Sequence, residues 1–198
     1  MTDVVIIASG GANIASLEFA LERLGCRPQL SSDPARIEHA THVILPGVGA
    51  AVDAMARLDA LGLTKRIPGL RQPVLGICLG MQLLYEHSEE GDTRCLGVLP
   101  GVARRFVARP GQPVPHMGWN QLRARRPSPL LTGIHDGDYA YFVHSYALPV
   151  GQETVATADY GDEFTAIVSH GNFHGTQFHP ERSARTGARI LTNFLDLS

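Results

Sequence analysis

The sequence lacks the features that mark secreted, membrane-bound or nucleic-acid-binding proteins. Only three of its 198 residues are cysteines, and their wide spacing predicts no disulfide framework. No apolar run approaches the roughly 20 residues that span a bilayer, and the first residues lack the basic and apolar regions of a signal peptide. A net charge of −2 gives no basic surface for nucleic acid. These absences predict a cytoplasmic protein with no membrane or nucleic-acid contacts.

What is present is an ordinary globular composition, with 44% hydrophobic and 18% charged residues, arranged in alternating elements. The length suits one domain over residues 1–198. Apolar periodicity predicts strands at Val4–Ala8, Pro28–Ser31, His42–Gly47 and Pro73–Ile77, and helices at Ala12–Gly25, Ala50–Leu61 and Leu79–His87. Such alternation is typical of a parallel sheet that helices cover on both faces.

The second half has a different character. Prolines, glycines and arginines interrupt any period between Pro100 and Gly137. Beyond them we expect short strands and a closing helix, at Tyr139–His144, Thr154–Ala158, Phe164–Ser169, Phe173–Gln177 and Ser183–Leu197.

The stretch PVLGICLGMQLL places Cys78 where an apolar strand gives way to a helix, between Gly76 and Gly80. This is the pattern of the G-x-S-x-G nucleophile elbow, with sulfur in place of oxygen. The glycines remove Cβ atoms that would collide at so tight a turn. A thiol at a helix N-terminus is favoured as thiolate, and the N–H of Leu79 would point toward an oxyanion. Alternatively, Cys78 is a small buried hydrophobic residue, as most isolated cysteines are.

A candidate base lies about 100 residues further along, in the segment GTQFHPERS. His179 ends an apolar strand and precedes Pro180, which favours an extended conformation at the histidine. Because positions i and i+2 of an extended segment point to the same side, Glu181 should reach the Nδ1–H of His179. We therefore predict a triad of Cys78, His179 and Glu181, with Nε2 facing the thiol.

The other histidines and cysteines have no comparable setting. His170 and His174 flank a Gly-Asn turn and are expected to face solvent. Cys26 and Cys95 are expected to be structural. No Cys/His spacing resembles a zinc site, and no metal or cofactor is predicted.

The elbow GICLGMQLL, the turn PGVG and the segment QFHPE together resemble class I glutamine amidotransferases, which release ammonia from glutamine. Within that family, PHMGWN (Pro115–Asn120), YFVHSYAL (Tyr141–Leu148) and SEEG (Ser88–Gly91) are similar to the glutaminase subunit of imidazole glycerol phosphate synthase, an enzyme of histidine biosynthesis. The likeness runs from Val4 to the closing helix. It implies a three-layer, flavodoxin-like α/β domain with a largely parallel central sheet and an antiparallel extension in the second half.

The resemblance also implies roles for individual residues. Cys78 would form a glutamyl thioester, with oxyanion donors at Leu79 and Gly49. Glutamine would be held by Gly47, Gln82, Glu90, Ser145 and Tyr146. One departure is the run Ser9-Gly10-Gly11-Ala12-Asn13, where many relatives have Gly-x-Gly-Asn, and it leaves the role of that loop open.

A partner is implied as well. In this family the ammonia passes to a (β/α)₈ cyclase subunit in a heterodimer, and the glutaminase has low activity until the cyclase binds its nucleotide substrate. The interface would include Asn13, Trp119, Tyr141 and Arg182. Trp119 has an alternative place in the core, because tryptophan is usually largely buried.

Three other interpretations stay open. The chain could be a glutaminase that serves a different synthase, although PHMGWN speaks against this. It could be a non-catalytic flavodoxin-like module whose cysteine senses oxidation, which would leave PGVG and HPE unexplained. It could also be a cysteine peptidase, although Gln82 and Glu90 suit a free amino acid.

Overall fold

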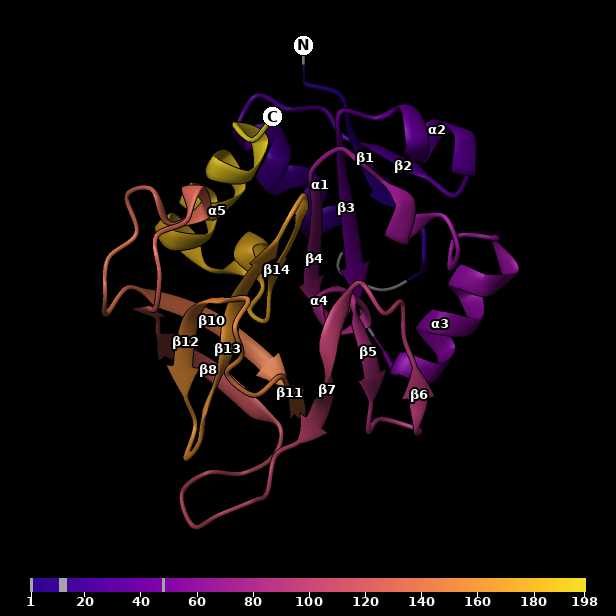
Figure 1. Cartoon of the computed structure of the whole chain (residues 1–198). Coiled ribbons are helices and arrows are strands. Elements are labelled where there is room, and N and C mark those ends of the chain that lie inside the picture. The colour runs from indigo at the N-terminus through magenta and orange to yellow at the C-terminus, as the bar shows by residue number, and fades with distance from the viewer. Residues whose placement is uncertain (1, 11–13, 48) are drawn as a thin grey trace.

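A mixed eight-stranded sheet runs through the middle of the molecule (Figure 1). The computed structural model describes residues 2–10, 14–47 and 49–198. Five strands make up the parallel part, in the spatial order β2 (Gln29–Ser31), β1 (Val4–Ile7), β3 (His42–Gly47), β4 (Val74–Cys78) and β14 (Phe173–Thr176). The apolar runs predicted as strands at β1, β3 and β4 are buried at every position except two intermediate residues, Ala8 and Pro46.

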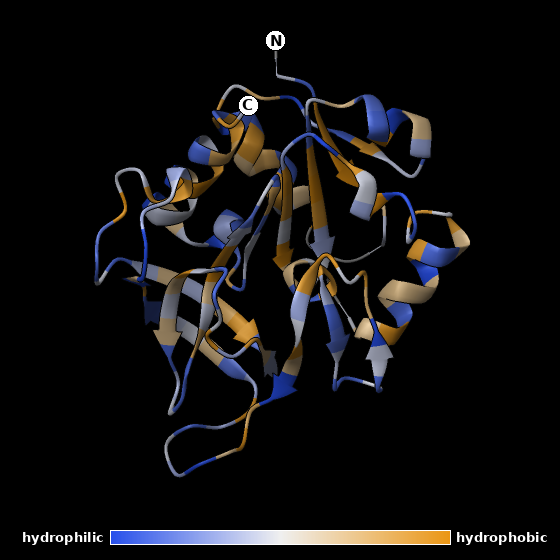
Figure 2. Ribbon diagram, in the orientation of Figure 1, coloured by the Kyte–Doolittle hydropathy of each residue, from blue (hydrophilic) through white to orange (hydrophobic). Residues whose placement is uncertain are grey.

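Helices cover both faces of this sheet, as the alternating pattern predicted. Helices α1 (Ile14–Arg23) and α5 (Ala184–Leu195) pack on one face, and α2 (Pro34–His39), α3 (Ala51–Ala60) and α4 (Leu79–Leu83) on the other. Strand β1 shows why both cores form: Val4 and Ile6 point into the first, and Val5 and Ile7 into the second. Figure 2 shows the central strands as the most hydrophobic part of the ribbon. No helix in the described ranges is long and apolar enough to cross a membrane.

Beyond β14 the sheet continues with antiparallel strands β13 (Glu163–His170), β12 (Thr154–Asp159) and β9 (Arg123–Ala124). The expected three-layer α/β domain, with its parallel sheet and antiparallel extension, is confirmed. Short 3-10 helices are η1 (Ile67–Gly69), η2 (Pro129–Leu131) and η3 (Pro180–Arg182).

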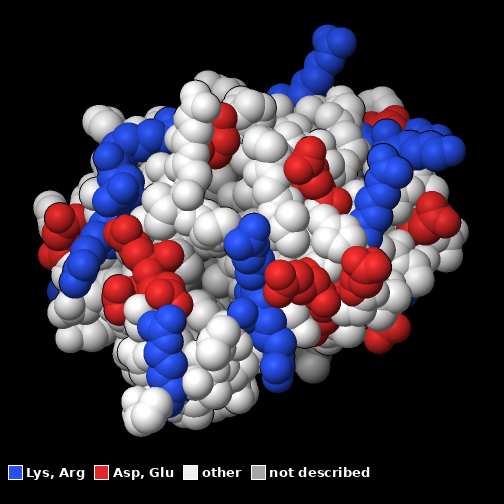
Figure 3. All heavy atoms as spheres, turned by 60° about the horizontal axis from the view of Figure 1, so that its bottom comes forward, with Lys and Arg blue, Asp and Glu red and all other residues white. Residues whose placement is uncertain are grey.

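Two smaller sheets complete the outer layers. Strands β8 (His116–Gln121) and β10 (Tyr139–His144) form an antiparallel pair, and the other sheet has the order β11 (Tyr146–Ala147), β7 (Leu99–Arg105), β5 (Tyr85–Ser88), β6 (Thr93–Arg94). On the face turned toward the viewer in Figure 3, acidic and basic side chains are interspersed, as the nearly balanced composition predicts.

Two expectations are wrong, and one region contains more regular structure than its sequence pattern indicates. The helix predicted over Leu79–His87 ends at Leu83, because the following residues pair with β7 and form strand β5. The region between Pro100 and Gly137, which shows no period, contains β8, β9 and most of β7. His174 is buried rather than solvent-facing, with 6% of its surface exposed, and its Nδ1 lies 2.7 Å from the hydroxyl of Ser169.

Candidate active site

Cys78 stands on a strained elbow at the carboxyl end of β4. It is the last residue of β4 and the N-cap of α4, with φ 53° and ψ −111°. A non-glycine residue in such a conformation costs about 1–3 kcal/mol and is found mostly at functional sites. The backbone is therefore bent in the manner of a nucleophile elbow, and the cavity described below opens at its apex.

The flanking glycines make this turn possible. A Cβ atom on Gly76 would lie 2.7 Å from the carbonyl oxygen of Gly80, so the two ends of the elbow do approach each other. A Cβ on Gly80, however, would collide with the carbonyl oxygen of Leu45 on the neighbouring strand. Gly76 thus serves the elbow itself, while Gly80 allows α4 to pack on β3.

The PGVG turn lies beside the elbow, as the implied role of Gly49 as an oxyanion donor requires. Gly47 is the register partner of Cys78 in the β3–β4 pair, and a Cβ on Gly47 would lie 2.6 Å from that of Leu79. Gly49 has φ +85° and lines the cavity. Val48 lies outside the described residues. The turn therefore brings backbone groups to the N-terminus of α4, where an oxyanion would form.

His179 and Glu181 form the predicted pair. The Nδ1 of His179 lies 2.8 Å from Oε1 of Glu181, and 7% and 3% of the two side chains are exposed. His179 is extended, with φ −94° and ψ 100°, but Glu181 lies in the 3-10 turn η3. The contact was predicted correctly from the wrong geometry, because the turn, and not a continuing strand, brings Glu181 back to the ring. Since a carboxylate only accepts, Nδ1 carries the hydrogen and Nε2 is left for the thiol.

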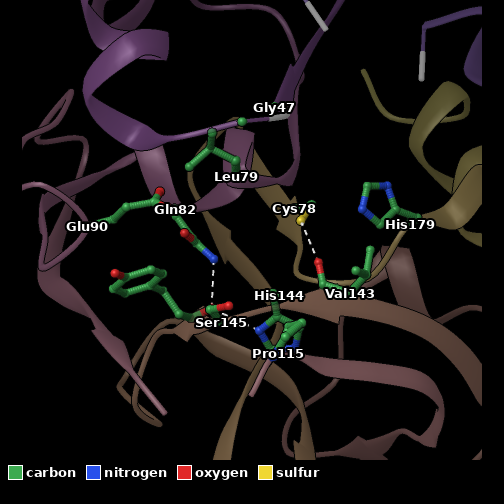
Figure 4. A pocket seen from close by; sticks show the side chains of 12 residues that line it. Gly47, Cys78, Leu79, Gln82, Glu90, Pro115, Val143, His144, Ser145 and His179 are labelled. Atoms are coloured by element: carbon green, nitrogen blue, oxygen red, sulfur yellow. Dashed lines mark hydrogen bonds between the residues drawn. The ribbon is translucent and has the colours of Figure 1, made fainter. Parts of the chain in front are cut away.

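The surroundings of His179 keep it protonated. Burial alone lowers the pKa of this imidazole, but hydrogen bonding and negative charge at Cys78 and Glu181 outweigh the burial and raise the pKa to about 10. An imidazolium beside a thiol favours the thiolate and is ready to give a proton to a leaving group. Figure 4 shows the His179 ring projecting toward Cys78.

A cavity of about 350 Å³ opens in front of Cys78 (Figure 4). Such a volume is at the small end of ligand sites, roughly 300–1,000 Å³. It brings together nine residues predicted from the sequence, namely Gly47, Gly49, Cys78, Leu79, Gln82, Glu90, Ser145, Tyr146 and His179. Pro115, Val143 and His144 also line it and were missed in these roles, although they lie in the segments PHMGWN and YFVHSYAL.

Gln82 is held in one orientation by a network that reaches Cys78. Its amide nitrogen donates to the Tyr146 carbonyl at 2.8 Å and to Oε1 of Gln177 at 3.0 Å. The amide nitrogen of Gln177 lies 3.8 Å from Cys78 Sγ. Gln177 was missed, although it stands two residues before His179, and the i, i+2 argument used for Glu181 indicates a common side.

A second network supports the opposite wall of the cavity. The Nδ1–H of His144 donates to the Tyr146 carbonyl at 2.8 Å, which leaves Nε2 to accept from Nδ1 of His116 at 3.0 Å. Nε2 of His116 in turn lies 3.3 Å from the amide nitrogen of Asn120. Burial lowers the pKa of His116 to about 4 and that of His144 to about 3, so both rings are neutral. The Tyr146 carbonyl thus accepts hydrogen bonds from both His144 and Gln82.

Glu90 and the two remaining cysteines complete the picture. Oε2 of Glu90 accepts a hydrogen bond from the N–H of Ala51 at 2.8 Å, so this carboxylate borders the cavity and also caps the start of α3. Cys26 and Cys95 are buried away from the cavity, as expected for structural residues. Burial raises the pKa of both thiols, that of Cys95 to about 11.

Three of the four predicted interface residues form one aromatic cluster. The Trp119 and Tyr141 rings meet edge to face with centroids 5.9 Å apart, and the Arg182 guanidinium lies 5.0 Å from the Tyr141 centroid. Trp119 is 53% exposed, so the alternative that it belongs to the core is wrong. Asn13 lies outside the described residues.

Comparison with known proteins assigns the fold and the site to a family. The family model of class-I glutamine amidotransferases matches residues 5–197. The chain is 57% identical to the imidazole glycerol phosphate synthase subunit HisH of Xanthomonas axonopodis pv. citri, covering 100% of this chain and 99% of that protein. It is also 57% identical to the subunit of the same name from Xylella fastidiosa, with 100% and 98% covered.

Solved structures with little sequence identity share the fold. A glutamine amidotransferase superposes with a TM-score of 0.74 at 20% identity, over 98% of this chain and 97% of that chain. PurLQS from Thermotoga maritima superposes with a TM-score of 0.72 at 20% identity, over 99% of each chain. The chain belongs to the class-I glutamine amidotransferases.

Proposed function

We propose that this chain is the glutaminase subunit of imidazole glycerol phosphate synthase and hydrolyses L-glutamine through the triad of Cys78, His179 and Glu181. The observation that carries the proposal is the pairing of His179 with Glu181 at 2.8 Å beside a cysteine on a strained elbow. The relatives that are 57% identical over the whole chain support the choice of synthase. We place the reaction in the cytoplasm, where the three free cysteines stay reduced.

The chemistry follows from the positions of these groups. The Cys78 thiolate attacks the carboxamide carbon of glutamine and forms a C–S bond. The N–H groups of Leu79 and Gly49 stabilise the resulting oxyanion. His179 then gives its Nε2 proton to the amide nitrogen, the C–N bond breaks, and ammonia leaves. A water molecule, deprotonated by His179, attacks the glutamyl thioester and releases glutamate.

The amino-acid end of glutamine binds at the far side of the cavity. With both amide hydrogens of Gln82 engaged by protein carbonyls, its Oε1 is the atom that remains for the substrate. We assign the carboxylate of Glu90 to the α-ammonium, and the backbone of Ser145 and Tyr146 to the α-carboxylate. Gly47 keeps the PGVG turn close enough to contact the side chain of glutamine.

The ammonia is consumed by a (β/α)₈ cyclase subunit that docks in a heterodimer on the cluster of Trp119, Tyr141 and Arg182. This cluster lies next to the triad, because the N–H of His179 donates to the Tyr141 carbonyl at 3.0 Å. The cyclase then forms imidazole glycerol phosphate and an aminoimidazole carboxamide ribotide. Activation by the bound cyclase would act on the PGVG turn, whose glycines permit a peptide flip that presents the oxyanion donor.

The test is glutamate release from a mixture of this chain, the cyclase subunit, glutamine and the ribulosyl-formimino nucleotide substrate. The wild type should release glutamate, and Cys78→Ala should release none. Cys26→Ala is the matched control, because it removes a thiol that is buried away from the cavity, and it should retain activity.

Each part of the proposal has its own contradicting result. Unchanged release by Cys78→Ala rules out the nucleophile. Full turnover by this chain without the cyclase contradicts partner activation. Stimulation by another synthase, but not by the cyclase, contradicts the choice of partner.

A further inference from the structure

The buried side-chain amide of Gln177 contacts both the sulfur of Cys78 and the side chain of Gln82. We infer that Gln177 is a positioning residue for glutamine cleavage, whose N–H stabilises the Cys78 thiolate while its carbonyl fixes the amide of Gln82. The inference rests on the proposed glutaminase function, but its first part concerns the thiol alone and can be measured without turnover.

The contacts of Cys78 Sγ show why a donor is needed there. The carbonyl oxygen of Val143 lies 3.7 Å from the sulfur, and a carbonyl accepts a hydrogen bond from a thiol but repels a thiolate. The side-chain amide nitrogen of Gln177 lies 3.8 Å from this sulfur and is an uncharged hydrogen-bond donor to it. Because Gln177 is 0% exposed, water does not compete for this N–H.

The carbonyl end of Gln177 has a second effect. Oε1 accepts from the amide nitrogen of Gln82 at 3.0 Å, and the backbone N–H of Gln177 is held by the carbonyl of Ala166 at 2.9 Å. The side chain of Gln82 is therefore held between the Tyr146 carbonyl and Gln177, whose own backbone is bonded to β13. Loss of the Gln177 carbonyl would let this amide turn, and its oxygen would no longer face the substrate.

The native titratable groups around the sulfur are unchanged in every variant of the test, and Gln177→Glu adds one carboxyl at position 177. His179, paired with Glu181, faces Cys78 from the position just before η3. His144 lines the same cavity from β10, and Glu90 borders it from the loop after β5. A change in the pH response of the thiol can then be assigned to position 177.

Two substitutions separate the two contacts. Gln177→Glu keeps an oxygen acceptor for Gln82 but replaces the donor to sulfur with a carboxyl, whose charge also disfavours the thiolate. Gln177→Met has a similar length and removes both contacts without adding charge, so it is the variant that measures the loss of the donor alone. The rate of alkylation by iodoacetamide is measured against pH on the isolated chain, with Cys78→Ala as the background. Kinetics of glutamate release are measured with the cyclase subunit and its nucleotide substrate.

We expect both variants to move the midpoint of the alkylation profile up by about one pH unit, that is, a tenfold smaller thiolate population at a given pH. Gln177→Glu should lower kcat about tenfold with KM within about threefold of the wild type, and Gln177→Met should raise KM about tenfold as well. Thr157→Val, an isosteric change at a buried threonine of β12, controls for the loss of a buried polar group and should leave the profile unchanged.

Wild-type midpoints in both variants, with melting curves that show a folded chain, would overturn the contact with the sulfur. An unchanged KM in Gln177→Met would overturn the role in orienting Gln82. If the wild type releases no glutamate while the alkylation midpoints still shift, the proposed function fails and the hydrogen bond to Cys78 stands.

Discussion

The close packing of the elbow predicts that one added methyl group at Gly80 disrupts both stability and the nucleophile. In Gly80→Ala the new Cβ would collide with the carbonyl oxygen of Leu45 and would lie 2.9 Å from its carbonyl carbon. Both are backbone atoms of a central strand, so no side chain can rotate away. Either α4 or β3 must move, and Cys78, the N-cap of α4, moves with them.

The magnitude follows from the space available. At Gly76 a Cβ would lie 2.7 Å from a carbonyl oxygen, which must withdraw by at least about 0.3 Å to reach the 3.0 Å that real Cβ atoms keep. Overpacking of this kind costs about 1–3 kcal/mol, so we expect that range for Gly76→Ala and about 3 kcal/mol or more for Gly80→Ala. A domain stability of about 5–15 kcal/mol leaves the variants folded, but a shift of the nucleophile by about 1 Å lowers catalysis about 100-fold.

Urea unfolding gives the stabilities, and alkylation of Cys78 with iodoacetamide reports the position of the thiol. Gly151→Ala is the matched control, because a Cβ there meets no atom within 4 Å and the backbone has no positive φ. It should be neutral or more stable by about 0.4–1 kcal/mol. A Gly80→Ala protein that matches Gly151→Ala in stability, with wild-type alkylation and glutamate release, would refute the steric account of the elbow.

Three other predictions concern the triad, the buried histidines and the docking surface. Glu181→Gln should lower kcat by roughly 10²- to 10⁴-fold, because His179 loses the carboxylate that orients it and helps to raise its pKa. A pH–rate profile of the variant with the cyclase present that matches the profile of the wild type would contradict this. The pKa of His116 and of His174 is about 4, below the ordinary 6.5, so the unfolded chain binds protons before the folded chain does as the pH falls. The free energy of unfolding should therefore be highest above pH 6.5 and fall by roughly 3 kcal/mol for each ring as the pH approaches 4. Urea midpoints that do not change between pH 7 and 4.5 would exclude this effect. Trp119→Ala should change the free energy of unfolding by less than about 1 kcal/mol, because Trp119 is 53% exposed. It should nevertheless weaken cyclase binding by about 2 kcal/mol or more. Equal affinities of the wild type and the variant for the cyclase in calorimetric titration would remove Trp119 from the interface.

The parts of the fold that could be predicted from sequence are those in which neighbouring residues set the structure. The apolar runs at β1, β3 and β4 can only be buried strands, and the observed bounds of β3 and β10 match the predicted ones, His42–Gly47 and Tyr139–His144. The elbow is local at Gly76, where an added Cβ would meet Gly80 and Met81, but Gly80 is required by the carbonyl of Leu45 on the neighbouring strand, which the sequence pattern does not reveal.

The failures occur where a distant partner overrides a local pattern. Residues Tyr85–Ser88 continue a plausible helical period, yet they become β5 because the edge of β7, which begins at Leu99, is available for pairing. Strand β8 alternates exposed with buried or half-buried residues, but its sequence contains a glycine and has its large apolar residues, Met117 and Trp119, on the exposed side, so its existence depends on its pairing with β10.

For the site, the sequence by itself determined which residues carry the chemistry, and the tertiary structure decided which groups surround them. Cys78, His179 and Glu181 are recognisable because a nucleophile, a base and an orienting acid need particular residue types in particular local settings. His116 and His144 are polar residues in apolar segments, and nothing local distinguishes them from satisfied core residues. The spacing of Gln177 from His179 indicates a common side, but it does not reveal a contact with the sulfur. Only the tertiary structure, which brings the segment after β14, strand β10 of the two-stranded sheet and helix α4 together, places their hydrogen bonds around the cavity. A hydrogen bond across 95 or 99 residues is a property of packing and not of sequence spacing.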